Sequence, residues 1–157
     1  MSGAGHLREQ ARMSSDEVDT FLRQRLTMSV ATHNRDHTIH VVGMWYGFVD
    51  GKIGFFTYQR SQKVRNLERD PSITCFVETG STYGQLRGVQ LVGRAVIVDD
   101  PAVVQALGED LHQRYVGPVD EAARAGVARN ARRRVAVVVT VYRVVSWDHT
   151  KVPSYGG

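Results

Sequence analysis

Six segments rich in β-branched and aromatic residues constrain the fold of this chain more than any other feature. Short polar stretches separate the first three, and Asp50-Gly51 is a typical two-residue hairpin turn. Gly88 and Gly93 lie inside the longest segment and predict a bulge or bend of the kind that closes a barrel. The predicted strands are residues 27–32, 37–49, 52–58, 72–78, 83–99 and 135–147. Because most of these strands follow one another in hairpin order, the sequence predicts a mainly β protein built on a small antiparallel barrel.

Four segments with helical character accompany the strands. Ser14 followed by Glu17 is a capping box, which predicts that a helix starts there. Asp100 followed by Pro101 is a cap with a proline in the first turn, which predicts a second helix start. The predicted helices are residues 15–25, residues 60–69, a stretch that opens at 100 and a stretch from about 120 to 130. These helices are expected to pack on the outside of the barrel.

The chain of 157 residues has the size of one ordinary domain. We expect residues 1–13 to form a flexible tail and residues 14–157 to form a single domain. No apolar run reaches the roughly 18 residues that a membrane span needs, and residues 1–15 lack the apolar core of a secretory signal. A cytoplasmic protein without a membrane span is therefore expected.

Arginines supply most of the formal net charge of +4, and they are dispersed along the chain. Residues 132–134 are the only run of three, and they lie where a predicted helix gives way to a strand. Cations favour the C-terminal ends of helices, so this run is interpreted as a solvated helix end. Nucleic acid is accordingly not expected as a partner.

The sequence contains no common catalytic or metal-binding motif. GxSxG, GxxxxGK, HExxH and CxxC are all missing. His37 and His40 are three residues apart in a predicted strand, so they point to opposite faces and predict no shared metal ion. The single Cys75 lies in an apolar strand and is predicted to pack in the core. Neither a catalytic triad nor a metal site is predicted.

The segment RSQKVRNLERDP predicts an anion-binding site. A helix that begins near Ser61 directs free backbone N–H groups and a partial positive charge towards its N-terminal end. Arg60, Lys63 and Arg65 add full positive charges in the first turns. The hydroxyl of Ser61 and the amide of Asn66 can donate hydrogen bonds to a phosphate or ribityl oxygen. The alternative for this segment is a solvated basic helix with a serine cap.

Two aromatic segments, GMWYG and FFTYQ, lie close to this helix in the predicted barrel. Flat apolar walls beside a phosphate site suit a ring cofactor with a phosphorylated tail. The alternative is that Trp45, Tyr46, Phe55 and Phe56 are ordinary core residues. Alternation along a strand allows only one of each adjacent pair to face inward, so the other needs a second interface or a ligand.

These segments resemble the pyridoxamine 5′-phosphate oxidase-like split β-barrels, and within them the flavin and deazaflavin oxidoreductases of actinobacterial type. The similar segments are DEVDTFLRQ, TMSVAT, HVVGMWYGFVDGKIGFFTY, SQKVRNLERDPSITC, RGVQLVGRAVIVDD and VYRVVSWDHTK. The resemblance covers about residues 15–151. It implies a split β-barrel with flanking helices and a homodimer that holds the cofactor in a groove between its two barrels.

The resemblance also implies a cofactor site. It assigns the phosphate to Ser61, Lys63 and Asn66, and the ring and its tail to Met44, Trp45, Thr57 and Tyr58. The implied activity is hydride transfer between the deazaflavin coenzyme F-420 and a small organic substrate. No catalytic side chain is predicted, because the cofactor carries the chemistry.

Two alternatives to this activity are open: an FMN-dependent oxidoreductase, or a non-catalytic protein that binds flavin, deazaflavin or haem. Members that oxidise vitamin B6 carry further C-terminal arginine and histidine positions. The end of this chain, WDHTKVPSYGG, offers only His149 and Lys151 in their place. We therefore do not expect vitamin B6 oxidation.

Overall fold

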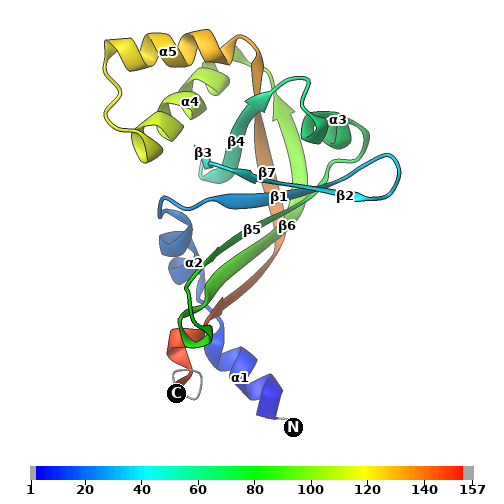
Figure 1. The fold of residues 1–157 in the computed structure, drawn as a ribbon, viewed down its shortest axis with the longest axis vertical. Coiled ribbons are helices and arrows are strands. Elements are labelled where there is room, and N and C mark those ends of the chain that lie inside the picture. The colour runs from blue at the N-terminus through cyan, green and yellow to red at the C-terminus, as the bar shows by residue number, and fades with distance from the viewer. Residues whose placement is uncertain (1–2, 154–157) are drawn as a thin grey trace.

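A computed structural model of the protein describes residues 3–153. Its strands form one antiparallel sheet in the order β2-β1-β5-β6-β7-β4-β3. They are β1 (Met28–His33), β2 (Ile39–Met44), β3 (Gly47–Val49), β4 (Lys52–Tyr58), β5 (Ser72–Thr79), β6 (Arg87–Val98) and β7 (Arg134–Asp148). The sheet curls into a barrel that stays open between its two edges (Figure 1). The predicted split β-barrel is confirmed.

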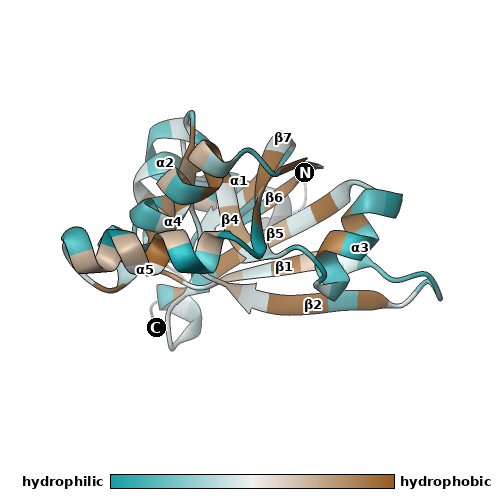
Figure 2. Cartoon of the chain, turned by 90° about the horizontal axis from the view of Figure 1, so that it is seen from above, coloured by the Kyte–Doolittle hydropathy of each residue, from teal (hydrophilic) through white to brown (hydrophobic). Residues whose placement is uncertain are grey.

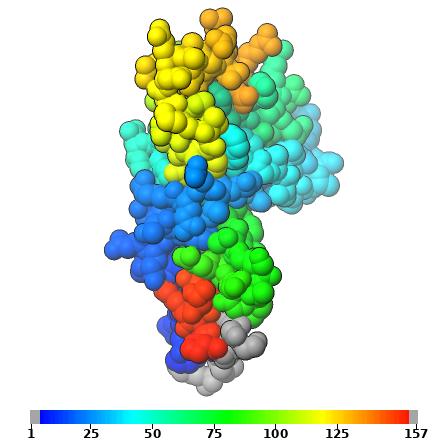
Figure 3. All heavy atoms as spheres, turned by 60° about the vertical axis from the view of Figure 1, so that its left-hand side comes forward, coloured from blue at the N-terminus to red at the C-terminus, as the bar shows by residue number. Residues whose placement is uncertain are grey.

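Five α-helices and two short 3₁₀ helices accompany the sheet within these residues. They are α1 (Gly3–Ala11), α2 (Ser15–Leu22), α3 (Gln62–Arg69), α4 (Pro101–Tyr115), α5 (Glu121–Ala131), η1 (Tyr83–Gln85) and η2 (His149–Lys151). Helices α4 and α5, in yellow to orange, form one end of an elongated molecule, and η2 lies near the other (Figure 3). No described helix is long and apolar enough to cross a membrane.

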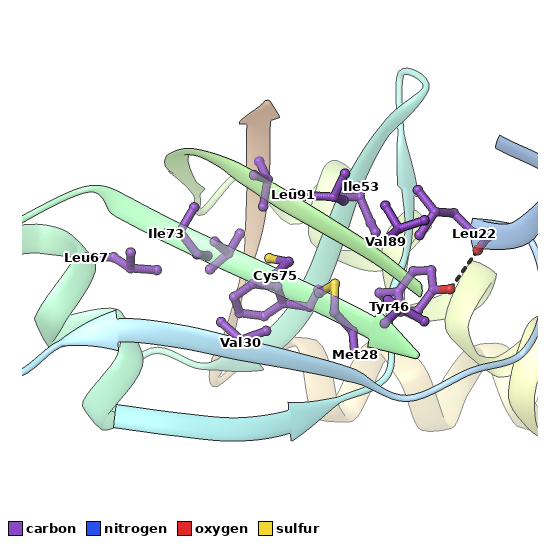
Figure 4. Packing of buried hydrophobic residues seen from close by; sticks show 14 of the residues in the cluster. Leu22, Met28, Val30, Tyr46, Ile53, Leu67, Ile73, Cys75, Val89 and Leu91 are labelled. Carbon is purple, nitrogen blue, oxygen red and sulfur yellow. Dashed lines mark hydrogen bonds between the residues drawn. The ribbon is translucent and has the colours of Figure 1, made fainter. Parts of the chain in front are cut away.

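The main core fills the inside of the curled sheet. Val30 and Cys75 come from the neighbouring strands β1 and β5 and are fully buried there (Figure 4). Burial raises the pKa of the Cys75 thiol to about 12, so it is a protonated core group, as the sequence predicts. The hydroxyl of the buried Tyr46 donates a hydrogen bond of 2.7 Å to the carbonyl oxygen of Leu22, which ties the end of α2 to the barrel.

A smaller core lies on the outer face of β4 and β7. Val104, Leu107 and Leu111 on one side of α4 are buried there with Ala136 of β7. Phe56 of β4 packs against the same cluster. One end of the barrel is thus covered by α4 and α5, while α3 lies beside β1 (Figure 1).

Several local signals have the predicted structure. The Ser14 side chain accepts a hydrogen bond from the Glu17 backbone, and Glu17 accepts one from the backbone of Ser14. The Asp100 side chain caps α4. Asp50 and Gly51 have φ angles of 50° and 77° in the tight turn between β3 and β4.

The bulge expected near Gly88 or Gly93 lies between Val92 and Gly93, where the register of β6 against β7 shifts. A Cβ atom on Gly93 would lie 2.4 Å from the carbonyl oxygen of Thr140. The bend therefore uses the close backbone approach that glycine permits.

Two N-terminal predictions differ from the structure. Residues 3–11 of the expected tail form helix α1, because Ala11 and Met13 are buried and the Met13 amide donates to Ser146 Oγ at 3.1 Å. The strand expected over residues 37–49 is broken into β2 and β3. The break lies at Trp45 and Tyr46, whose side chains diverge, with Tyr46 fully buried and Trp45 about half exposed.

Two C-terminal predictions also differ. The strand expected from residue 83 starts at Arg87, because η1 precedes it. The last strand is apolar from Val135 to Tyr142 apart from Thr140, which predicts burial on both of its faces. Val135–Val139 are buried, but Tyr142 is 68% exposed, because no element among residues 3–153 covers that face of the sheet.

Candidate functional site

Ser61 occupies the N-cap position of α3 but does not cap it. Its backbone is extended, with φ −69° and ψ 156°, yet its side chain makes no capping hydrogen bond. The Oγ atom is buried and has no hydrogen-bond partner among the described residues. By contrast, the N-cap side chains Ser14, Asp100 and Asp120 all accept a hydrogen bond from their helices. A buried hydroxyl without a partner at a helix N-terminus is suited to a ligand oxygen.

Lys63 lies in the first turn of the same helix and is only 8% exposed. No carboxylate of the described residues lies within 4.0 Å of its ammonium group. Burial and the nearby Arg134 guanidinium both lower the pKa of Lys63. A buried cation next to a second cation is unfavourable until a negative group joins them.

Arg134 is the site residue that sequence reasoning missed. As the first residue of β7 it pairs with Tyr58 of β4, and its guanidinium carbon lies 4.0 Å from the centre of the Tyr58 ring and 4.7 Å from that of Phe56. Its Nε is buried and has no hydrogen-bond partner among residues 3–153. Arg132 and Arg133 are exposed, as a solvated helix end should be, but Arg134 is not. Arg134 reaches the site because of the pairing register between β4 and β7, and no local sequence signal predicts that register.

A pocket of about 440 Å³ adjoins this cluster of Ser61, Lys63 and Arg134. Its walls come from the end of β2, from β4, from α4 and α5, and from the start of β7. They are Gly43, Met44, Trp45, Phe56, Gly108, Leu111, His112, Val116, Val127, Asn130 and Arg134. The walls are mainly apolar, and Arg134 belongs both to the pocket and to the cationic cluster.

Trp45 is fixed in this wall by contacts with α4. Its ring stacks on Tyr115 with the ring centres 4.7 Å apart and the planes 1° from parallel. The Tyr115 hydroxyl donates a hydrogen bond of 2.8 Å to the carbonyl oxygen of Leu26. The aromatic wall is thereby tied to the segment that precedes β1.

Asn66 does not offer its amide to the cluster. It is fully buried, and its Nδ2 donates to Thr32 Oγ1 at 3.0 Å and to Asn34 Oδ1 at 2.8 Å. Its Oδ1 accepts from Gln62 Nε2 at 2.9 Å. Both amide hydrogens are used inside the protein, so Asn66 fixes α3 against β1, and its contact with a phosphate stays a prediction.

The other predicted residues fall into two groups. Met44 and Trp45 line the pocket, and the Tyr58 ring lies against the Arg134 guanidinium. Thr57 faces the opposite side of β4 from Tyr58 and is buried, because neighbouring residues in a strand alternate. The side chains of Thr57 and Tyr58 therefore do not share one surface.

Two further sequence features lie outside this site. His149 and Lys151 belong to η2, which lies near the end of the molecule away from α4 and α5 (Figure 3), and Lys151 pairs with Glu17 at 2.6 Å. Among residues 3–153, no three histidine, cysteine or acidic side chains are grouped so that they could hold a metal ion.

Solved structures similar to this chain share its architecture. The conserved hypothetical protein Rv2991 from Mycobacterium tuberculosis is 36% identical, with 92% of this chain and 91% of that chain covered and a TM-score of 0.89. A protein described as an F-420 reductase is 25% identical, with 80% and 94% covered and a TM-score of 0.62. An FAD-binding protein from Mesorhizobium loti is 16% identical, with 85% and 94% covered and a TM-score of 0.63, and it shows the fold alone.

The curated proteins gave no match to the sequence. The family described as pyridoxamine 5′-phosphate oxidase matches residues 14–148, which include the whole barrel, α3 and the cationic cluster. The chain therefore belongs to the pyridoxamine 5′-phosphate oxidase family.

Proposed function

We propose that this protein binds coenzyme F-420 at the cationic cluster and the adjoining pocket, and that it transfers hydride between this cofactor and a small organic substrate. The observation that carries the proposal is the cluster itself. Ser61, Lys63 and Arg134 bring a buried hydroxyl and two cations together, and no described carboxylate pairs with the cations. A single phosphate group could accept hydrogen bonds from all three side chains and balance the two positive charges.

The pocket fits the ring part of such a cofactor. Its volume of about 440 Å³ and its apolar walls suit a flat fused ring, with Trp45 and Phe56 as aromatic surfaces. Arg134 lies where the pocket meets the cluster, so a ring in the pocket can continue into a phosphorylated tail at α3.

In this mechanism the bound cofactor supplies the hydride chemistry. Lys63 and Ser61 hold its phosphate, which is remote from the reacting ring. Trp45, fixed by its stack on Tyr115, orients the ring, and the apolar walls exclude water. No side chain acts as a general acid or base in this proposal, because the cofactor carries the chemistry.

The preference for F-420 over FMN is supported by the sequence resemblance and by the F-420 reductase that is 25% identical to this chain. The FAD-binding protein that shares the fold is too distant to support a flavin in its place. FMN-dependent oxidation and binding without catalysis are the outcomes that compete with this proposal.

A homodimer is part of the proposal. Ile39 and Val41 on β2 and Tyr142 and Val145 on β7 are apolar and between 43% and 68% exposed. Figure 2 shows the hydrophobic residues along the outer strand β2. A second copy would bury this sheet face, because monomers rarely leave such faces open. The cytoplasmic location expected from the sequence also belongs to the proposal.

The test is a titration of the purified protein with oxidised F-420 and with FMN, followed by fluorescence. We expect tighter binding of F-420. Turnover is then measured as oxidation of reduced F-420 with menadione as a probe acceptor. Tighter binding of FMN would favour the flavin alternative, and F-420 binding without turnover would indicate a binding protein. Failure to bind either cofactor would contradict the proposal.

A further inference from the structure

Arg134 differs from the other cations of the site because it reaches the ring pocket. It lines the pocket, whereas Lys63 and Ser61 do not. Its guanidinium lies on the Tyr58 and Phe56 rings, at 4.0 and 4.7 Å from their centres, which fixes its position. A phosphate at the start of α3 and a ring in the pocket would both lie beside this one side chain.

The charge of Arg134 is not balanced inside the protein. No described carboxylate lies within 4.0 Å of it, and its buried Nε has no hydrogen-bond partner among residues 3–153. The cation Lys63 lies close enough that the charge of Arg134 contributes to lowering its pKa. Between apolar walls a charge acts more strongly than in water, so the pocket favours a ligand with negative charge.

The rings of the two candidate cofactors, F-420 and FMN, differ in their charge at neutral pH. The hydroxyl group of an 8-hydroxy-5-deazaflavin is acidic and conjugated with the pyrimidine part, so at neutral pH its negative charge spreads over the ring. The oxidised flavin ring of FMN carries methyl groups there and is neutral. Both cofactors have the phosphate, so contacts with the phosphate do not distinguish them.

We infer that Arg134 selects the cofactor by the charge of its ring, favouring an anionic deazaflavin over neutral oxidised flavin. The inference rests on the proposed function. Lys63 and Ser61 serve only the phosphate common to both cofactors, whereas Arg134 lies beside both the phosphate and the ring. Arg134 is thus a specificity-determining residue, and Lys63 is an affinity residue without preference between the two rings.

Other titratable groups lie around the pocket and the cationic cluster, and their effects must be distinguished from that of Arg134. Tyr58 of β4 lies under the guanidinium, Lys63 of α3 lies beside it, and His112 of α4 lines the pocket wall. Helix α5 contributes the uncharged Asn130 and Val127. A His112→Asn variant, which carries no ionisable side chain at that position, is the control for these titrations.

The first measurement is the pKa of the cofactor's ring hydroxyl, read from its visible absorbance in the free and protein-bound states. We expect binding to wild-type protein and to His112→Asn to lower this pKa by about one unit. Arg134→Gln removes the charge and should return the pKa close to the free value, whereas Arg134→Lys should keep most of the shift. Melting curves of each variant confirm that it is folded.

The second measurement is the ratio of the F-420 and FMN dissociation constants. Arg134→Gln should lower the preference for F-420 about tenfold, which corresponds to a shift of one pKa unit. Lys63→Met should weaken both cofactors in the same proportion. These ratios are independent of turnover.

The failures of the two proposals can be told apart. If wild-type protein binds F-420 but leaves the pKa of its ring hydroxyl unchanged, selection by ring charge is wrong and the proposed function stands. The same holds if Arg134→Gln weakens F-420 and FMN equally. If wild-type protein binds neither cofactor, the proposed function itself is wrong.

Discussion

At the scale of single residues, Lys63 stands apart from other cations of this protein. Arg87 pairs with Asp148 at 3.2 Å and Lys151 pairs with Glu17 at 2.6 Å. Lys63 is more buried than either of these cations. The only charged group that shifts its pKa is another cation, Arg134. A buried charge that lowers the stability of the ligand-free protein is typical of a residue whose role is to bind a ligand.

Replacing Lys63 with methionine should therefore stabilise the ligand-free protein. Methionine keeps the buried chain and removes the unpaired charge, so the free energy of unfolding should rise by about 0.5–2 kcal/mol. Urea denaturation of both proteins measures the difference. A loss of stability in Lys63→Met would mean that the ammonium group has a favourable partner in the fold.

The effect of Lys63 on the free energy of unfolding should depend on pH. The pKa of Lys63 is lowered in the folded state, so the unfolded state binds its proton more tightly. The free energy of unfolding should then rise as the pH increases from the lowered pKa towards the ordinary lysine value of about 10.4. This contribution should disappear in Lys63→Met.

Asn66 offers a second prediction, about the anchoring of α3. Asn66→Ala removes the hydrogen bonds to Thr32, Asn34 and Gln62 and leaves buried polar groups without partners, at a cost of about 1–3 kcal/mol. Arg65→Ala on the exposed side of the same helix is the matched control and should change stability by less than about 0.5 kcal/mol. Equal effects in urea denaturation would contradict the anchoring role.

Sequence reasoning located part of this site and not the rest. Ser61 and Lys63 were found because a helix start and its charges are local signals. Arg134 comes from the far end of the chain, and only strand pairing brings it to Tyr58. The role of Asn66 depends on β1, which lies more than 30 residues away in the sequence.

At the scale of elements, the pocket depends on how α4 is held against the barrel. Arg114 Nε donates to the Tyr46 carbonyl at 3.1 Å, and the Tyr115 hydroxyl bonds to Leu26. These bonds fix the helix end that carries the stacking partner of Trp45. The same contacts explain why the expected long strand breaks at Trp45 and Tyr46, a break that no turn residue marks in the sequence.

How closely α4 packs against α5 can be tested at two glycines, one on each helix. A Cβ on Gly108 would lie 2.5 Å from Val127 Cγ1, so Gly108→Ala should destabilise the protein by about 1–3 kcal/mol. Gly126 of α5 has no heavy atom closer than 3.7 Å, so Gly126→Ala should stabilise by about 0.4–1 kcal/mol. Thermal unfolding should show opposite signs for the two. Stabilisation by both would mean that α4 and α5 are not closely packed at this point.

The elements themselves were largely predictable because their signals are local. The capping residues of α2 and α4 and the Asp50-Gly51 turn mark their own positions. Helix α1 was missed because it has little amphipathic pattern, and Ala11 and Met13 are buried only through contacts with distant parts of the chain.

At the scale of the whole molecule, the open face of the sheet predicts self-association. Tyr142→Glu places a charge on this face, where Tyr142 is 68% exposed in one chain. Light scattering should give twice the chain mass of 17.5 kDa for wild-type protein and a shift towards the monomer for Tyr142→Glu. Ala106→Glu, an exposed position on α4, should leave the mass unchanged. A monomeric wild-type protein at micromolar concentration would contradict the homodimer.

The central claim is that the cluster of Ser61, Lys63 and Arg134 binds the phosphate of a ring cofactor, and titration of Lys63→Ala tests it most directly. Removing one charge while the helix N–H groups stay should weaken binding of F-420 or FMN by about 1.5–3 kcal/mol, a factor of about 10 to 150. Added salt should weaken wild-type binding more than that of the variant, and riboflavin, which lacks the phosphate, should bind both proteins equally. Equal affinities of wild type and Lys63→Ala for both phosphorylated cofactors at low salt would contradict the account.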